Sequence, residues 1–435
     1  MVRYIYVVDS AADDELGKVI SKISPECLYS LIGGLRQKQF GIDTLFKEVS
    51  KINKFRSQIV IPSKGTQYID SGGYSIIQGQ VSPNSVRRFI KCYNAYLENE
   101  IENYERVFSL DIPFSRKFNI INTVDAIYSF NRESLSDSRE LMVKYPGLRD
   151  KMYFVWHFKM NSQYEIWKKL YKELNLDSLV KKRAIGGMVG MREVTKKSFS
   201  PFTPMAYKCL FDFVLNNSDE TEFCLHFLGM HINYDRFQIA LLEKLFQEYL
   251  GDSVSVNMTY DSISYAQTAR MGNSGPIYLD DSGSKICFKS ISDIPEIMLH
   301  RIYGNITPQI LGEINLRIHK QKLINCNSFA PLFINSNINE DKIFENIIDQ
   351  YEIAKVIITA NSPSVVSCRL RSVLDEIKKN YSDMFTGEFL KSIVENIEAT
   401  VVFDRWFRCS KDLVQLDELI RNFNSWHGFP DLLKY

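Results

Sequence analysis

The sequence predicts an α/β fold: a (β/α)8 TIM-like barrel over residues 1–290, followed by a helical region over residues 291–435. Two observations carry this prediction. Short apolar segments alternate with longer helical patterns about eight times over about 260 residues, which favours a closed barrel over an open sheet. After residue 290 the apolar residues follow helical spacing instead, so this region either extends the barrel or completes it.

The predicted strands are rich in β-branched and aromatic residues and are almost continuously apolar. This composition is typical of parallel strands that are buried on both faces. The strands span residues 4–8, 58–61, 68–70, 107–111, 153–157, 184–187, 223–228 and 254–261.

Helices are predicted between these strands by apolar residues at helical spacing. Within the barrel they cover residues 83–104, 122–143, 163–174, 204–215 and 234–250. Ser82 and Pro83 mark the start of the first one, as a cap and a first-turn proline. In the C-terminal region the predicted helices cover residues 291–323, 341–360, 362–379 and 413–423.

Composition excludes several classes of protein. The chain has 435 residues, 45% of them hydrophobic and 24% charged, which is ordinary for a globular protein. Lys and Arg number 53 against 52 Asp and Glu, so there is no global basic signature, although a local basic face remains open. No apolar run approaches the roughly 20 residues of a membrane span. The eight cysteines are scattered without a CxxC pair, so we expect reduced thiols and a cytoplasmic protein without a membrane partner.

Polar residues stand at the carboxyl ends of the predicted strands, where barrel enzymes place their active sites. A single such residue is often only a helix cap or turn former. Three carboxylates and two imidazoles at successive strand ends instead predict a common cleft. They are Asp70, Asp111, His157, His226 and Asp261.

Two glycine pairs lie beside these residues. Asp70-Ser71-Gly72-Gly73 allows close approach of the backbone to a flat ligand, or forms only a tight strand-to-helix turn. Gly186-Gly187-Met188 leaves similar room. Basic residues flank the second pair, and they form either a solvated face or a contact to a phosphate backbone. They are Lys181, Lys182, Arg183, Arg192, Lys196 and Lys197.

Five short motifs, in this order, resemble those of the tRNA-guanine transglycosylase family. Together they cover about residues 65 to 275, which is most of the predicted barrel. The motifs are Ile69-Asp70-Ser71-Gly72-Gly73-Tyr74, Leu110-Asp111-Ile112-Pro113, Ile185-Gly186-Gly187-Met188, His226-Phe227-Leu228-Gly229-Met230, and Asp261-Ser262-Ile263-Ser264-Tyr265-Ala266 with Ala269-Arg270.

The resemblance implies a pentosyltransferase that exchanges guanine in a nucleic acid for a 7-deazaguanine base of the preQ0 type. Asp261 is then the nucleophile that captures the sugar, Asp70 the general acid and base, and Asp111 the acceptor for the N1–H and 2-amino groups. The other expected substrate contacts are Ser71, Gly72, Gly73, Tyr74, His157, Gly186, Gly187, Met188, His226 and Met230, with Tyr74 or Met230 stacking on the base. The expected contacts to the nucleic-acid backbone are Lys182, Arg183, Arg192 and Arg270.

The chain departs from the family pattern at two places. His157 stands where the family has a glutamine that reads the base carbonyl, so the preferred incoming base is open. Cys326 stands alone where the family has three zinc-binding cysteines, and Tyr351 and Glu352 occupy the region of its histidine. One thiol cannot form a closed tetrahedral zinc site, so we expect no metal and no cofactor, the alternative being zinc held by residues such as Cys287 or His300.

The degraded zinc motif, the divergent loops and the expected lack of the extra RNA-binding domains of archaeal tRNA enzymes favour the DNA-modifying relatives of phages and bacteria. We therefore expect DNA as the polymer, with tRNA as the alternative and helper proteins of a modification system as further partners. Two other classes remain open: a glycosylase that releases the base to water, and a nucleic-acid-binding relative without catalysis. Two carboxylates at positions 70 and 261 argue against the last of these.

Overall fold

The computed structural model describes most of the barrel and the helices that follow it. The described residues are 3–9, 26–31, 66–73, 81–113, 124–158, 161–187, 221–230, 232–262, 264–271, 276–281, 284–303, 329–359 and 363–387, with single residues elsewhere between 50 and 404.

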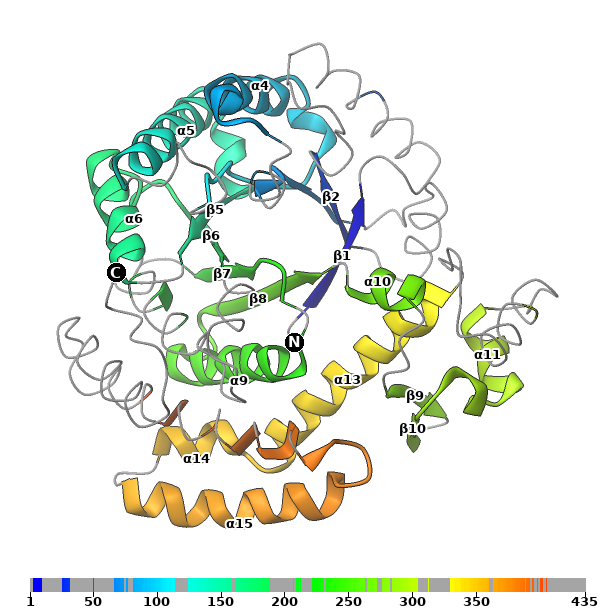
Figure 1. The fold of residues 1–435 in the computed structure, drawn as a ribbon. Coiled ribbons are helices and arrows are strands. Elements are labelled where there is room, and N and C mark those ends of the chain that lie inside the picture. Colours follow the sequence, from blue (N-terminus) through cyan, green and yellow to red (C-terminus); the bar gives the residue numbers. More distant parts are fainter. Residues whose placement is uncertain are drawn as a thin grey trace.

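Eight parallel strands form a closed barrel in sequence order, which confirms the predicted fold class (Figure 1). The ring closes where β8 pairs with β1, with Ile5 opposite Asp261. The strands are β1 (Arg3–Asp9), β2 (Glu26–Ser30), β3 (Thr66–Asp70), β4 (Arg106–Phe108), β5 (Met152–His157), β6 (Lys182–Gly186), β7 (Glu222–Phe227) and β8 (Ser255–Ser262).

Helices surround the barrel, and those predicted over 83–104, 122–143, 163–174 and 234–250 lie close to their predicted positions, whereas the helix over Ser264–Met271 was not predicted. In Figure 1 they form an arc around the outside of the strands. The predicted helix over 83–104 is divided into a first 3-10 turn, an α-helix and a second 3-10 turn. The elements are η1 (Pro83–Ser85), α4 (Val86–Asn99), η2 (Ile101–Asn103), α5 (Val124–Lys144), η3 (Pro146–Asp150), α6 (Asn161–Glu173), α9 (Asn233–Leu250) and α10 (Ser264–Met271).

The strand assignment from sequence differs from the structure at two places. β2 was not predicted, because its five residues, Glu-Cys-Leu-Tyr-Ser, include a charged and a polar end and form too short an apolar run. The predicted strand over 58–61 lies outside the described residues, as do most of the predicted helix over 204–215 and all of the one over 413–423. A hairpin of β9 (Ile277–Asp281) and β10 (Ser284–Phe288) was also missed.

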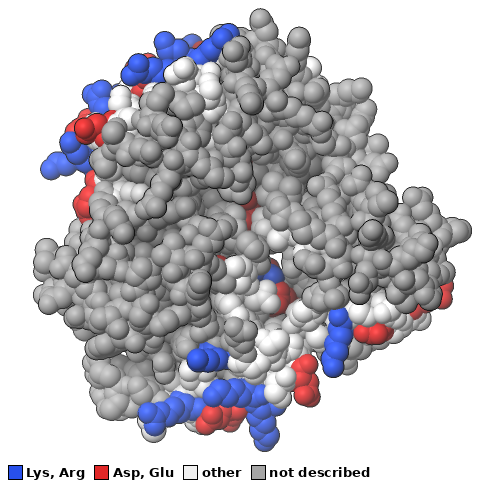
Figure 2. All heavy atoms as spheres, in the orientation of Figure 1, with Lys and Arg blue, Asp and Glu red and all other residues white. Residues whose placement is uncertain are grey.

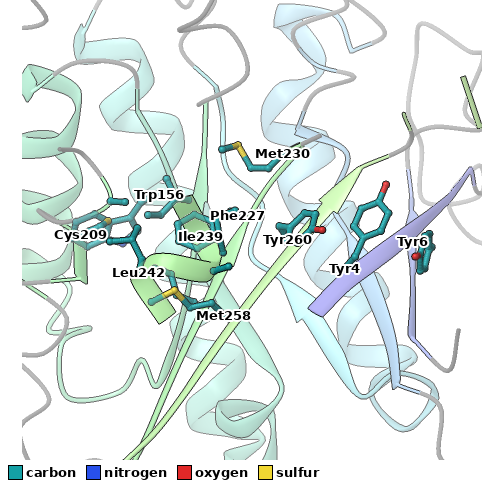
Figure 3. Packing of buried hydrophobic residues seen from close by; sticks show 14 of the residues in the cluster. Tyr4, Tyr6, Trp156, Cys209, Phe227, Met230, Ile239, Leu242, Met258 and Tyr260 are labelled. Atoms are coloured by element: carbon teal, nitrogen blue, oxygen red, sulfur yellow. The ribbon is translucent and has the colours of Figure 1, made fainter. Parts of the chain in front are cut away.

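Alternation along the strands separates two apolar cores. Inward-facing residues such as Tyr68, Phe108 and Tyr153 fill the barrel interior. Their sequence neighbours face outward and pack under the helices; Figure 3 shows Met258 and Tyr260 of β8 in this outer cluster together with Ile239 and Leu242, which come from the helix outside β8. Since successive side chains of a strand point to opposite faces, each strand contributes to both cores.

Of the helices after residue 290, α13 and α14 pack against the helices that surround the barrel, while α15 packs on α14 and α11 on α13. Helix α13 contacts α9 and α10, and the hydroxyl of Tyr6 on β1 donates to the carbonyl of Ile334 at 3.4 Å. Figure 1 shows α14 and α15 beyond α9, away from the strands. The elements are η5 (Ile291–Asp293), α11 (Glu296–Tyr303), α13 (Ala330–Gln350), α14 (Ile353–Thr359) and α15 (Pro363–Tyr381).

A buried ion network ties α13 to the barrel wall. The guanidinium of Arg236 on α9 bonds Asp341 at 2.6 Å, and it also contacts Glu340 and the hydroxyl of Tyr260 on β8. A charge buried this deeply requires such partners, so this region of α13 and the outer side of β8 are held in one arrangement. In the described part of the chain, none of the helices has both the length and the apolar composition needed to span a membrane.

Candidate active site

The predicted site residues meet inside the carboxyl end of the barrel. Asp70 ends β3 and lies opposite Ser30 of β2, while His157 ends β5 opposite Gly186 of β6. Asp261 lies near the end of β8, two residues after the inward-facing Thr259. Parallel strands in register bring these ends to one face of the barrel, so residues almost 200 positions apart share a site.

Asp261 is buried and held through one of its two oxygens. His226 Nε2 lies 2.9 Å from Oδ1, and the backbone N–H of Gly229 donates to the same oxygen at 3.0 Å. No hydrogen bond from a described residue reaches Oδ2. The carboxylate is therefore fixed in orientation while one oxygen stays available to a substrate, as a nucleophile requires.

Asp70 has the electrostatic environment of a proton donor. Burial, together with the negative charges of Asp261 and Asp111, raises the pKa of Asp70 from 3.8 to about 7. Hydrogen bonds from the Gly72 backbone and the Ser30 side chain oppose this shift without cancelling it. A carboxyl group with this pKa is partly protonated at neutral pH, so it can give and take a proton there.

Asp111 and His157 form a second pair. His157 Nδ1 lies 2.9 Å from Asp111 Oδ2, and both side chains are less than a tenth exposed. His157 Nε2 is buried and has no hydrogen-bond partner among the described residues. Since a buried polar atom rarely stays unpaired, this nitrogen is a candidate ligand contact.

Two side chains of α5 that the sequence analysis did not single out hold the Asp111 loop. Asn131 accepts from the Ile112 N–H at 2.8 Å and donates to its carbonyl at 3.1 Å. Ser134 donates to the Leu110 carbonyl at 2.6 Å. The signal available in the sequence was polar residues on the buried face of a predicted helix, which require partners.

The glycines of the two motifs leave space for the side chains of Asp111 and His157. A Cβ on Gly73 would lie 2.8 Å from Asp111 Oδ1, and one on Gly186 would lie 3.0 Å from His157 Nδ1. Gly187 has a φ of 93°, and a Cβ there would lie 2.7 Å from the Phe158 carbonyl. The glycine motifs thus pack around the polar pair, in addition to any role they have toward a ligand.

Other predicted contacts are buried or fall outside the described residues. The Ser71 hydroxyl is buried without a hydrogen-bond partner in the described structure, beside Gly72 with its φ of 83°. Met230 is 2% exposed within the outer core. The residues whose side chains lie outside the described set are Tyr74, Met188, Arg192 and Arg270, the last of them on α10.

Two of the predicted contacts to the nucleic-acid backbone are wrong. Lys182 and Arg183 begin β6, at the opposite end of the barrel from Asp261, and both are buried. Lys182 Nζ lies 3.2 Å from Glu222 and from Cys224 Sγ inside the barrel. The Arg183 guanidinium lies over the Trp156 ring at 4.7 Å and pairs with Asp177. A basic run predicts an exposed face only where it does not enter a buried strand, and here it does.

Exposed basic side chains lie at the outer edges of the described surface. Figure 2 shows Lys and Arg over α4 and α5 and, at the opposite edge, over α15. Among them Arg87 and Arg88 on α4 and Arg371 on α15 are exposed.

His226 was expected to contact the base, and the structure corrects this assignment. Its side chain has no exposed surface, and both ring nitrogens already have partners in Thr259 and Asp261. Its ring packs on Phe108, with the centroids 4.7 Å apart, so it lies beneath Asp261 in the barrel interior. Any effect of His226 on a substrate must therefore pass through Asp261.

Over the described residues there is no group of three or more His, Cys, Asp or Glu side chains that could hold a metal ion. Cys287 lies on β10, and His300 pairs with Glu296 on α11 at 3.6 Å. Cys326 falls outside the described residues, so the segment that resembles the family's zinc region is not placed.

Comparison with known proteins leaves the family unassigned. No protein-family model matches the chain, and no curated protein matches it. An endo-1,4-beta-xylanase from Caldicellulosiruptor owensensis is similar over 60% of this chain and 85% of its own, with 11% identity and a TM-score of 0.36. SrfJ from Salmonella typhimurium is similar over 60% of this chain and 65% of its own, with 10% identity and a TM-score of 0.30. At these scores neither likeness carries an argument about function.

Proposed function

We propose that this protein is a pentosyltransferase that replaces guanine in DNA by a 7-deazaguanine base, through a covalent intermediate on Asp261. One observation carries the proposal: an Asp261 carboxylate oriented through a single oxygen shares a site with Asp70, whose pKa is raised to about 7. A fixed nucleophile beside a proton donor is the pair that glycosidic bond exchange requires.

In the first half of the reaction, Oδ2 of Asp261 attacks C1′ of the target nucleotide. The C1′–N9 bond breaks and its electron pair goes to the departing guanine, which takes a proton from Asp70. The product is a sugar ester of Asp261 and free neutral guanine. Proton donation of this kind contributes typically ~10²–10⁴-fold to the rate.

In the second half, the incoming base gives its N9 proton to Asp70, and N9 attacks C1′. The ester bond to Asp261 breaks, which restores both carboxyl groups and leaves the new base on the sugar. Asp111, whose neighbour Ile112 is held by Asn131, accepts from the base N1–H and 2-amino groups, and His157 lies beside it. A base in a duplex must first be flipped out of the stack, at a cost of a few kcal/mol.

DNA is proposed as the polymer because the sequence resembles the DNA-modifying branch of the family. This choice of polymer rests on the sequence, in which Cys326 stands alone where the tRNA enzymes have three cysteines. Of the predicted backbone contacts, Arg192 and Arg270 remain candidates, because Lys182 and Arg183 are buried at the far end of the barrel.

The test supplies radiolabelled 7-deazaguanine base with either duplex DNA or unmodified tRNA and counts the label in the washed polymer. Label in DNA alone supports the proposal, and label in tRNA alone overturns the choice of polymer. In parallel, released guanine is measured without added base. Guanine release without uptake of label identifies a hydrolytic glycosylase instead, and neither release nor uptake with both polymers contradicts the proposed exchange.

A further inference from the structure

We infer that Thr259 and His226 form a buried positioning relay that selects which oxygen of Asp261 reacts. Thr259 Oγ1 lies 2.8 Å from His226 Nδ1, and His226 Nε2 lies 2.9 Å from Asp261 Oδ1. All three residues are inside the barrel, two of them on β8 and one on β7. The inference rests on the proposed function for its chemical meaning, and on these contacts for its geometry.

The contacts fix the tautomer of His226. A proton on Nε2 can be donated to the carboxylate oxygen, whereas a bare Nε2 would place two lone pairs against each other at 2.9 Å. Nδ1 must then accept, and the Thr259 hydroxyl is the donor within reach. The aromatic rings of Phe108, Tyr68 and Tyr153 pack around the imidazole and hold it in this orientation.

This tautomer determines which oxygen of Asp261 is engaged in hydrogen bonds. Oδ1 accepts from His226 and from the Gly229 N–H, so its lone pairs are engaged in both bonds. Oδ2 remains as the oxygen that attacks C1′. His226 and Thr259 touch neither sugar nor base in this arrangement, so they are positioning residues that act through Asp261.

The first test reads the tautomer directly and needs no substrate. The whole protein is labelled with ¹⁵N-histidine, and the signal of His226 is identified among the six histidines by its loss in His226→Gln. We expect a protonated Nε2 and an unprotonated Nδ1. A proton on Nδ1, alone or together with Nε2, overturns the inference whatever the enzyme's substrate.

The second test measures the rate of covalent adduct formation with guanine-containing DNA in a single turnover. Thr259→Val keeps the shape of the side chain and removes the hydroxyl, and we expect the rate to fall about 10- to 100-fold at unchanged DNA affinity. Thr259→Ser keeps the hydroxyl and should keep most of the wild-type rate of adduct formation. His226→Gln should also keep most of this rate, because its amide can still donate to Oδ1. Thr359→Val, on the surface helix α14, is the control and should leave the rate unchanged.

The outcomes separate this inference from the proposed function. If the Nε2–H tautomer is found and Thr259→Val is slow while Thr259→Ser is fast, the relay is supported. Equal rates for Thr259→Val and wild type overturn it. If the expected tautomer is found but wild type forms no adduct with either DNA or tRNA, the relay geometry is supported and the proposed exchange fails.

Discussion

Tyr260 and Asp261 are neighbours on β8, and their side chains face opposite sides of the strand. Tyr260 faces outward, where its hydroxyl donates to Asp341 of α13 and accepts from Arg236. Asp261 faces inward, where it accepts from His226 and Gly229. The candidate nucleophile is therefore anchored from within the barrel, and its strand is anchored from the helices that follow the barrel.

Asp261→Asn should abolish the covalent adduct and leave DNA binding almost unchanged, because the amide is a poor nucleophile of nearly the same size. The adduct is detected by mass shift after denaturation, and binding by fluorescence anisotropy. Asp252→Asn, on the exposed turn after α9, is the matched control and should form adduct normally. Base exchange at the wild-type rate by Asp261→Asn would show that the nucleophile has been misassigned.

The rate of adduct formation should fall about tenfold per pH unit above pH 7, because the acid form of Asp70 is lost above its pKa of about 7. Asp70→Asn should be about 10²–10⁴-fold slower below pH 7 and show no such fall. Single-turnover rates between pH 5.5 and 9 measure both. A wild-type profile that stays flat across this range contradicts the role of Asp70.

Asp70 should also lower stability at alkaline pH. Because its folded-state pKa of about 7 exceeds the ordinary value of 3.8, the folded protein holds a proton that the unfolded chain releases between these values. The contribution of this carboxyl to folding is thus lost as pH rises through about 4 to 7. Asp70→Asn cannot ionise, so it should be more stable than wild type at pH 8. We expect a difference of only about 1–2 kcal/mol, because solvent partly screens the Asp70 carboxylate. At pH 4.5 the difference measured by urea denaturation should be much smaller.

Asp111→Asn should weaken recognition of guanine-type bases far more than binding to the polymer. Asn presents one acceptor and one donor where the base edge requires two acceptors. Competition by free guanine measures the first property, and anisotropy with DNA the second. Equal losses in both would indicate a folding defect, which the thermal unfolding midpoint of the variant would then reveal.

Gly187→Ala should destabilise the protein by about 2–4 kcal/mol and impair base recognition. Alanine is strained at a φ of 93°, and its Cβ would press on the Phe158 carbonyl and the His157 ring. Gly251→Ala separates the two effects, because Gly251 has a φ of 77° and no heavy atom within 4 Å of the added Cβ. The control should lose about 1 kcal/mol through strain alone. If the free energy of unfolding falls by the same amount in both variants, then the close packing of Gly187 against His157 does not add to the cost of the substitution.

Arg236→Ala should reduce the free energy of unfolding by about 3–5 kcal/mol, because it leaves Glu340 and Asp341 buried without their counter-charge. Arg87→Ala is the control: its pair with Glu133 lies on the surface, and its loss should cost less than about 1 kcal/mol. A small effect at Arg236 would mean that its ion pairs contribute little to holding α13 against the barrel.

The barrel, and the strand ends at which its polar residues gather, follow from the amino-acid sequence alone. Buried parallel strands leave a continuous apolar signal, and this signal located β3, β5 and β7 near their observed limits. It missed β2, whose polar ends Glu26 and Ser30 mask its apolar centre. The chemistry proposed for Asp70, Asp111 and Asp261 comes from their residue types and from a family resemblance, and both are properties of the sequence.

Which polar residues face the site and which face away depends on how the chain folds. Lys182 and Arg183 lie in one basic run with Arg192, yet strand alternation and position bury them at the far end of the barrel. His226 carries the same side chain as His157, but its position one layer below Asp261 makes it a support for that carboxylate. The sequence does not show that Thr259 pairs with His226 or that Asn131 pairs with Ile112, because a hydrogen bond depends on the distance between atoms that the chain brings together only when it folds.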